Sequence, residues 1–231
     1  MSWPYDFETR GIRALPHRLR LRKLLRQLRR YDFSAGSYAD VGCGDGYATF
    51  QIIQATRATA CDGMDRDPAL LENGRATLQQ IRFCSYDLCR DANVPARYDF
   101  VTCFETLEHV MNLPVAVKNL LSLTKPGGTL LLSVPIEIGP IGIAKFLAKI
   151  VLWRDQLTEA FEPCPALYRQ YLKALIFDQG IHKFREPGNP LGYWPGHWGW
   201  DYRKLNRLLK DYGVQFTAFR FHTTCFYEVR P

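Results

Sequence analysis

Apolar residues recur along the chain with two periods, one typical of strands and the other of helices. Short apolar runs alternate with longer segments whose apolar positions lie three or four residues apart. Strands are predicted over residues 37–41, 58–64, 81–86, 98–104 and 129–134, with helices between them over about 46–55, 68–79 and 114–123. This alternation predicts right-handed βαβ units around a buried parallel sheet.

The pattern changes after Pro135. Residues 136–198 contain apolar stretches, proline, glycine and aromatic residues without strand spacing, so we predict an insert with helical parts. A helix over 201–212 then ends at Gly213, and two closing strands, 214–221 and 223–229, lie close enough in sequence to pair as a hairpin. The expected fold class is α/β, with a doubly wound, mostly parallel, seven-stranded Rossmann-like sheet that ends in an antiparallel hairpin.

The same pattern predicts four segments. An amphipathic helix lies in residues 1–35, the main part of the sheet in 36–135, the insert in 136–198, and a closing helix and hairpin in 199–231. Leucines at positions 21, 24, 25 and 28 place the apolar stripe of the first helix on one face.

Charge is unevenly distributed, and this bears on partners. The chain has 231 residues and a net charge of +7, but residues 10–30 carry nine Lys or Arg and no acid, whereas residues 31–140 carry eight basic and thirteen acidic residues. A protein that binds nucleic acid with its whole surface is basic throughout. We therefore do not expect a nucleic-acid partner.

Cysteine usage and hydropathy indicate a cellular location. The seven cysteines are odd in number, contain no C-x-x-C pair and fall largely within apolar runs, which is typical of reduced core thiols. The first residues lack the pattern of a secretory signal, and no apolar run is long enough to span a bilayer. We expect a cytoplasmic protein.

A glycine-rich turn after the first strand is the strongest candidate for a binding site. Residues 40–46 read Asp-Val-Gly-Cys-Gly-Asp-Gly, and Gly42, Gly44 and Gly46 permit a tight turn and close approach of a ligand. In a doubly wound sheet this turn lies at the carboxyl edge of the central strand, where ligands bind. Asp65 and Asp87 follow the second and third strands, where carboxylates can bind a ribose and an adenine amino group.

The acidic surroundings of the turn favour one class of nucleotide. A dinucleotide site usually reads G-x-G-x-x-G and holds a doubly negative pyrophosphate, which Asp40 and Asp45 would repel. The spacing here is G-x-G-x-G. Two carboxylates instead suit a cofactor that carries a sulfonium and an ammonium group, which indicates S-adenosylmethionine.

At this point the motifs resemble those of class I SAM-dependent methyltransferases. The resemblance covers the glycine turn, the two acidic positions, the block Tyr98–Val110 and the Lys-Pro-Gly-Gly turn at 125–128. Glu105-Thr-Leu-Glu-His109 and His197-Trp198 look most like the small-molecule branch that includes demethylubiquinone O-methyltransferases. The resemblance implies a cofactor site formed by Asp40, Gly42, Cys43, Gly44, Gly46, Asp65, Arg66, Asp87, Leu88 and Phe104, with Phe104 over the sulfonium.

Transfer to a hydroxyl requires a base, and histidine is the usual residue. His109 follows the fourth strand beside the expected methyl position, and His197 lies in an aromatic segment, Trp194–Trp200, that suits an acceptor pocket. Both are candidate catalytic residues, with Glu137 and His182 as weaker ones. Glu105, Glu108, His109 and a distant histidine also resemble a metal arrangement of some relatives, but we expect no metal.

The expected acceptor is a small or lipid-linked molecule, methylated at oxygen. The apolar stretch 138–152 and the basic helix 17–30 allow peripheral contact with an anionic membrane, at the inner face. Two alternatives stay open: an RNA methyltransferase that binds phosphates through its basic N-terminal segment, and a non-catalytic subunit with the same fold. A dehydrogenase is a more distant alternative.

Overall fold

The computed structural model describes residues 15–90, 97–152, 165–177, 180–185, 197, 199–221 and 223–231. Its centre is one seven-stranded sheet in the order β3-β2-β1-β4-β5-β7-β6. The strands are β1 (Tyr38–Val41), β2 (Cys61–Asp65), β3 (Ile81–Ser85), β4 (Tyr98–Phe104), β5 (Thr124–Pro135), β6 (Gln215–Phe221) and β7 (Thr224–Arg230). The first five pair in parallel, and β7 pairs antiparallel with both β5 and β6.

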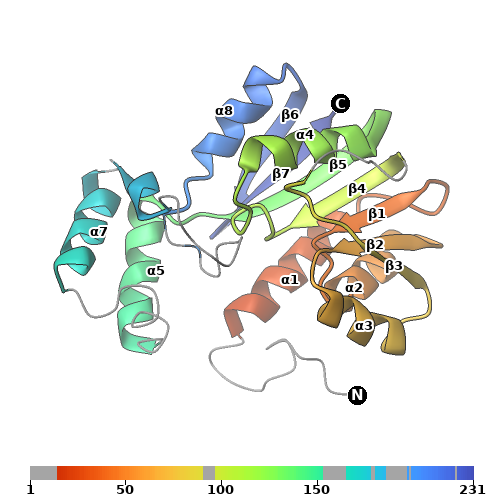
Figure 1. Cartoon of the computed structure of the whole chain (residues 1–231), viewed down its shortest axis with the longest axis horizontal. Helices are drawn as coiled ribbons and strands as arrows, with labels where there is room; N and C mark the ends of the chain where they lie inside the picture. The colour runs from red at the N-terminus through yellow and green to blue at the C-terminus, as the bar shows by residue number, and fades with distance from the viewer. Residues whose placement is uncertain are drawn as a thin grey trace.

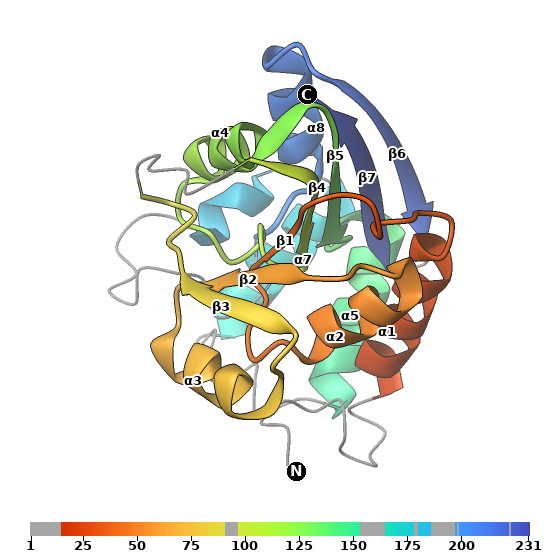
Figure 2. The same ribbon diagram turned by 90° about the vertical axis from the view of Figure 1, so that its right-hand side faces the viewer.

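Helices cover both faces of this sheet, as the doubly wound pattern predicts. Figure 1 shows α4 and α8 on one face and α1, α2 and α3 on the other, and Figure 2 shows α1 lying beside α2. The bounds are α1 (Leu15–Leu28), α2 (Tyr47–Thr56), α3 (Pro68–Thr77), α4 (Leu113–Leu123) and α8 (Arg203–Asp211). Asp67 begins α3 by accepting hydrogen bonds from two N–H groups of its first turn, the usual role of an N-terminal cap.

Alternation along the strands divides the core in two. In β5, Leu130 and Leu132 pack into the cluster that includes α4 and α8, whereas Leu131 between them packs into the cluster that includes α1, α2 and α3. Successive side chains of a strand point to opposite faces, so one fully buried strand supplies both cores. The α/β fold class and the antiparallel closing hairpin are confirmed.

The fifth strand begins earlier than the sequence predicts. Thr124 already pairs with Tyr98, and the register shifts before regular pairing resumes between Phe100 and Thr129. The Pro126-Gly127-Gly128 turn therefore lies inside the strand as an irregularity. Gly127, at φ +77, supplies the left-handed backbone conformation that this turn requires.

Within its described residues, the insert contains two α-helices and a short 3-10 helix. These are α5 (Gly139–Leu152), α7 (Pro165–Phe177) and η1 (Ile181–Arg185). Figure 1 shows α5 and α7 beside each other, to one side of the sheet, and the Phe146 and Tyr171 rings join them at a centroid distance of 5.3 Å. Among the described residues, no helix has the length and apolar character needed to cross a bilayer.

Candidate functional site

The candidate site lies where the strand order reverses. β1 has β2 on one side and β4 on the other, so the loops that leave β1 and β4 diverge at this point and open a crevice at the carboxyl edge. The turn after β1 is fixed to the end of β2, since the N–H groups of Gly42 and Cys43 both donate to the carbonyl oxygen of Met64, at 2.7 and 3.1 Å. The sequence placed the turn correctly.

Each of the three glycines of the turn is needed for a different structural reason. All three have positive φ, between 58° and 83°. A Cβ at Gly42 would meet Thr106, and one at Gly46 would meet Phe83, so these two are required by packing within the protein. At Gly44 the nearest atom is a Leu70 methyl carbon at 4.0 Å. Of the three, Gly44 alone has open space where a side chain would lie.

Asp65 closes this space from the neighbouring strand. One carboxylate oxygen accepts the Gly44 N–H at 2.9 Å, and the other accepts the Asp67 N–H at 3.0 Å. An ionised carboxylate has about four acceptor positions, so two remain for the hydroxyls of a ribose. The hydrogen bond to Gly44 also ties the predicted ribose position to the turn.

The expected adenine side is formed by the loop after β3. Asp87 accepts the Cys89 N–H at 2.9 Å and lies 3.3 Å from Arg90, with 30% of its side chain exposed. Leu88 is buried in the core, where Asn119 donates to its carbonyl oxygen at 3.1 Å. The backbone of Leu88, rather than its side chain, therefore faces this loop. Arg66, which follows β2, is exposed.

One residue of this loop had no signal in the sequence. The Tyr86 hydroxyl is buried and has no hydrogen-bond partner among the described residues. Burial raises the pKa of Tyr86, and the neighbouring Asp87 raises it further. A buried phenol beside an acidic residue at the expected adenine position is a candidate donor to the base that motif spacing does not reveal.

Asp40 and Asp45 support the turn from within the protein. Both oxygens of Asp40 accept hydroxyl hydrogen bonds, from Thr49 of α2 and Thr102 of β4. Burial raises the pKa of Asp40 to about 6. Asp45 accepts the Tyr47 N–H at 3.1 Å at the start of α2, and burial raises its pKa as well. Asp40 thus lies beneath the turn, as expected.

Two residues assigned to the cofactor also pack into the core. The Cys43 side chain is 7% exposed and belongs to the cluster beneath α2, where burial raises the pKa of its thiol. The Phe104 ring stacks on Phe226 of β7, with centroids 5.7 Å apart. The Cys43 backbone remains in the turn, and the placement of Phe104 over the sulfonium stays a prediction.

The end of β4 carries a second group of polar residues. Glu105 has φ +51, an unusual value for a residue with a side chain. Its carboxylate is held from two directions, by the Ser133 hydroxyl at 3.0 Å and by Arg20 of α1. This arrangement brings the basic N-terminal helix to the edge of the candidate site.

Glu108, His109 and His197 come together beside Glu105. Glu108 is fully buried, and one of its oxygens lies 3.6 Å from His197 Nε2 and 3.8 Å from His109 Nε2. The two imidazole rings are 5.2 Å apart. The structure therefore brings together the two predicted catalytic histidines, although they lie 88 positions apart in the chain.

Burial and Glu137 determine the protonation state of His197. The Nδ1 atom of His197 lies 3.2 Å from a Glu137 oxygen, and Lys145 of α5 contacts the same oxygen. Burial lowers the pKa of His197 to about 4, against the opposing effect of Glu137, so the ring is neutral at pH 7. The neutral ring has a free lone pair for a proton, and Glu137 counteracts the loss of basicity that burial causes.

The cluster is also a chemically reasonable metal site. One ligand atom from each of Glu108, His109 and His197 lies within 4.8 Å of the other two. A carboxylate oxygen and two imidazole nitrogens suit a zinc ion. The sequence expectation of no metal stays untested.

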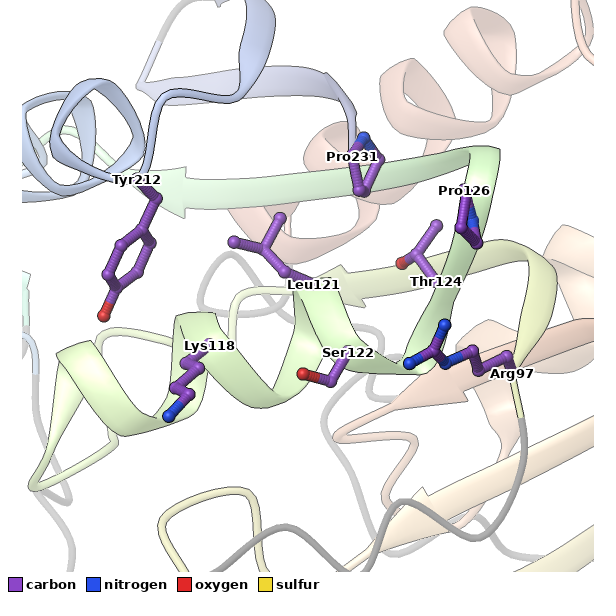
Figure 3. Close-up of a pocket in the computed structure, with 8 residues that line it drawn as sticks. All are labelled: Arg97, Lys118, Leu121, Ser122, Thr124, Pro126, Tyr212 and Pro231. Atoms are coloured by element: carbon purple, nitrogen blue, oxygen red, sulfur yellow. The ribbon is translucent and has the colours of Figure 1, made fainter.

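Other candidates lie apart or outside the described residues. His182 is exposed on η1, and Trp194 and Trp198, expected in the acceptor pocket, lie outside the described residues. A cavity of about 410 Å³ lies where β4 and β5 begin, at the edge opposite the glycine turn (Figure 3). Its lining includes Arg97, Lys118 and Tyr212, none of which was a site candidate.

Comparison with known proteins agrees with this geometry. Residues 13–185, more than half of the chain, match the family described as a methyltransferase domain. A ubiquinone biosynthesis O-methyltransferase of Coxiella burnetii is 32% identical over 98 residues, 41% of each chain. A trans-aconitate 2-methyltransferase of an Enterobacter species is 24% identical over 132 residues, 57% of this chain and 52% of that protein. This chain thus spans about half or less of these relatives' length.

A solved structure shares the fold over nearly the whole chain. The magnesium protoporphyrin IX methyltransferase of Synechocystis PCC 6803, with bound SAH, has a TM-score of 0.58 and 16% identity, and the match covers 98% of this chain and 91% of that one. The strand order, the glycine turn and the family match lead to one assignment. The chain belongs to the methyltransferase-domain family and has the Rossmann-like methyltransferase fold.

Proposed function

We propose that the protein methylates a hydroxyl oxygen of an apolar small-molecule or lipid-linked acceptor. The observation that carries this proposal is the position of His197, whose neutral ring lies beside Glu108 and His109 at the carboxyl edge of the sheet. A hydroxyl must lose its proton during methylation, and a neutral histidine accepts protons. The O-methyltransferase name of the Coxiella relative supports oxygen as the acceptor atom.

The cofactor supplies, when bound, a methyl group on a positively charged sulfur. Gly44 gives room beside the turn, Asp65 offers acceptors to the ribose, and Asp40 adds negative charge beneath. The acceptor oxygen forms a bond to the methyl carbon, while the carbon–sulfur bond breaks with its electron pair on sulfur. The hydroxyl proton goes to Nε2 of His197, with His109 beside it. Orientation of this kind can contribute up to about 7–11 kcal/mol to catalysis.

Exposed apolar side chains on the insert support an apolar or lipid-linked acceptor. Leu147 and Ile150 of α5 are 50% and 40% exposed, and Ile176 and Phe177 of α7 are 54% and 68% exposed. These two helices pack together beside the sheet (Figure 1). Contact with an anionic membrane, aided by the basic α1, is part of this proposal. Absence of co-flotation with anionic vesicles at low salt would remove the membrane part.

A divalent metal at Glu108, His109 and His197 is the second candidate arrangement for the same transfer. The observation in its favour is the convergence of three ligand atoms within 4.8 Å. In that case His197 would hold the ion rather than accept the proton. The two candidates differ in their response to chelation.

The decisive experiment is a transfer assay with methyl-labelled SAM. Phenolic, catecholic and polyprenyl-linked phenolic acceptors would be compared with matched carboxylic acid and amine acceptors. We expect labelled product with a hydroxyl acceptor, with mass spectrometry locating the methyl group on oxygen. His197→Gln should reduce kcat by about 10²–10⁴-fold while SAH affinity is retained. Transfer only to nitrogen or to a carboxylate would contradict the proposal.

A further inference from the structure

Asp40 carries a buried negative charge that no cation neutralises. It lies near the end of β1, just before the glycine turn, and is almost fully buried. Among the residues that the structure describes, no lysine, arginine or histidine forms an ion pair with it, and the charged side chain that acts on its carboxylate is Asp65, which is also negative. Buried charges in proteins are usually paired. Asp40 is therefore an exception that requires a physical reason.

Neutral donors hold the Asp40 carboxylate in place of a cation. Thr49 of α2 donates its hydroxyl proton to one oxygen, and Thr102 of β4 donates to the other. The Tyr38 hydroxyl lies 2.8 Å from the Thr102 oxygen. Because the only hydroxyl proton of Thr102 is directed at Asp40, Tyr38 is the donor in that contact. The hydrogen bonds of Asp40 thus point into the protein, and its charge stays uncompensated.

These contacts keep most of the Asp40 carboxylate ionised at neutral pH. Burial raises the pKa of Asp40 to about 6, and the two threonine hydroxyls act in the opposite direction. Thr49 lies in the first turn of α2, and the N-terminus of a helix carries partial positive charge. Burial raises the pKa of the nearby thiols, Cys43 on the turn, Cys61 on β2 and Cys103 on β4, so they are neutral.

The methyl donor changes its charge during the reaction, whereas Asp40 does not. SAM carries a sulfonium cation, and SAH, which remains after methyl transfer, has a neutral sulfur with the same adenosine and amino acid groups. A charge in the protein interior acts more strongly on another charge than a solvated one does, because the local dielectric constant is low. A contact that both molecules make, such as the expected one between Asp65 and the ribose, distinguishes them little. A fixed charge beneath the turn does distinguish them.

We propose that Asp40, held by Thr49 and Thr102, is the fixed negative charge that raises the affinity of the site for cationic SAM relative to neutral SAH. The two threonines are positioning residues that support the ionised carboxylate. Methyl transfer then removes a favourable interaction, which promotes the release of SAH. The inference deepens the proposed function, since it concerns the methyl donor used there, but SAM and SAH bind without an acceptor, so it is tested independently.

The primary test is calorimetric titration of the full chain with SAM and with SAH at pH 7.5. The quantity of interest is the affinity ratio, the Kd of SAH divided by the Kd of SAM. Asp40→Asn, of nearly the same shape, should lower this ratio about 5- to 30-fold, the range expected for a unit charge in partly buried surroundings. Sinefungin, in which a protonated amine replaces the sulfonium, should lose affinity as SAM does. An unchanged ratio in Asp40→Asn, with both ligands still bound, would overturn the proposal.

Matched controls separate the charge of Asp40 from other effects. Asp62→Asn removes a carboxylate of β2 that Arg82 already neutralises, and it should leave the affinity ratio unchanged. Asp65→Asn should weaken SAM and SAH by similar factors, because both contain the ribose. If Asp62→Asn lowers the ratio as much as Asp40→Asn does, the effect is one of net charge and the proposal is wrong.

Paired variants test the two threonines. Thr102→Val removes the hydroxyl at nearly constant volume, and it should lower the affinity ratio in the same direction as Asp40→Asn but by less, since part of Asp40 then takes up a proton. Thr102→Ser retains the hydroxyl and should retain the ratio of the unsubstituted protein. Thr49→Val and Thr49→Ser repeat the comparison at the other oxygen. Equal ratios within both pairs would contradict the role of the hydroxyls.

The possible failures have different meanings. If neither SAM nor SAH binds to the unsubstituted protein, the assignment of the cofactor site is wrong as well as this inference. If the ratio changes as expected in Asp40→Asn but no hydroxyl acceptor is methylated, the proposed function is wrong and the role of Asp40 stands.

Discussion

Arg20 donates a hydrogen bond to the carboxylate of Glu105 across 85 positions of sequence. The contact joins the N-terminal helix to the end of β4, and each side chain is 20% exposed. Because Glu105 also has a left-handed backbone, Arg20 helps to hold a residue in a conformation that it would not otherwise prefer. The Arg-rich helix therefore has a structural role at the site, whatever surface its other charges contact.

We expect Arg20→Gln to lower the free energy of unfolding by about 1–3 kcal/mol, since it leaves a largely buried carboxylate without its cation. Urea unfolding measures this change. Arg22→Gln, at an exposed position on the same helix, is the control and should change stability by less than about 0.5 kcal/mol. Equal effects of the two substitutions would show that the contact with Glu105 is not important.

Gly44→Ala should weaken SAH binding at least tenfold by placing a methyl group in the space beside the turn. It also carries a backbone cost of about 1–2 kcal/mol, because Gly44 has positive φ. Gly127→Ala is a matched control, with positive φ, no atom within 4 Å of the added Cβ and a position at the opposite edge of the sheet. Calorimetric titration with SAH should show a loss for Gly44→Ala only. Similar affinities for both variants would mean that the cofactor lies elsewhere.

Asp65→Asn should weaken SAH binding by about 1–3 kcal/mol, roughly 5- to 150-fold, as charge-assisted hydrogen bonds to the ribose are lost. The asparagine can still accept the Gly44 N–H, so the turn should remain folded. Asp62→Asn, earlier in β2 and bonded to Arg82 and Tyr98, removes the same charge away from the crevice. A normal affinity for Asp65→Asn would show that the ribose does not bind there.

Asp40 predicts a pH dependence of stability. Its pKa is about 6 in the folded protein and 3.8 as the ordinary value, so between these values the folded state holds a proton that the unfolded state does not. The contribution of Asp40 to the free energy of unfolding is therefore fully present below pH 3.8. It falls by up to about 3 kcal/mol as the pH rises through 6. Relative to Asp40→Asn, the unsubstituted protein should lose stability between about pH 4 and about pH 6.5. Parallel pH profiles in urea unfolding would contradict this.

Chelation distinguishes the two arrangements of the histidine cluster. We expect turnover of a hydroxyl acceptor to survive EDTA treatment followed by gel filtration, because His197 itself is proposed to take the proton. The assay would be repeated after addition of Mg²⁺, Mn²⁺ or Zn²⁺. The metal arrangement would instead be established if EDTA abolishes activity and one of these ions restores it in the unsubstituted protein but not in His109→Gln.

Local spacing was sufficient to predict that Asp40, Gly44 and Asp65 lie at one edge of the sheet; their contact with the cofactor stays a prediction. Asp40, Gly44 and Asp65 follow consecutive parallel strands, and such strands end at one edge whatever the details of the fold. The three glycines were indistinguishable in sequence, because packing against Thr106 or Phe83 and room for a ligand both require glycine. Only the structure shows which reason applies to each.

The contacts of the second half could not be predicted in the same way. His197 meets His109, and Arg20 meets Glu105, through loops and helices whose paths do not follow from periodicity. The insert gives no strand spacing from which to infer where its residues lie, so Glu137 ranked only as a weak candidate and Lys145 was not a site candidate at all. Long-range electrostatic partners of this kind carry no local signature.

The reversal of strand order beside β1 separates the two halves of the site along the chain. In the proposed function, Asp40 to Leu88 form the side for SAM, whereas Glu105, Glu108, His109, Glu137 and His197 form the side for the acceptor. Each side can therefore change with little effect on the other. Exchange of the segment after β5 between related chains is a direct route to new acceptor preferences that keep the same methyl donor.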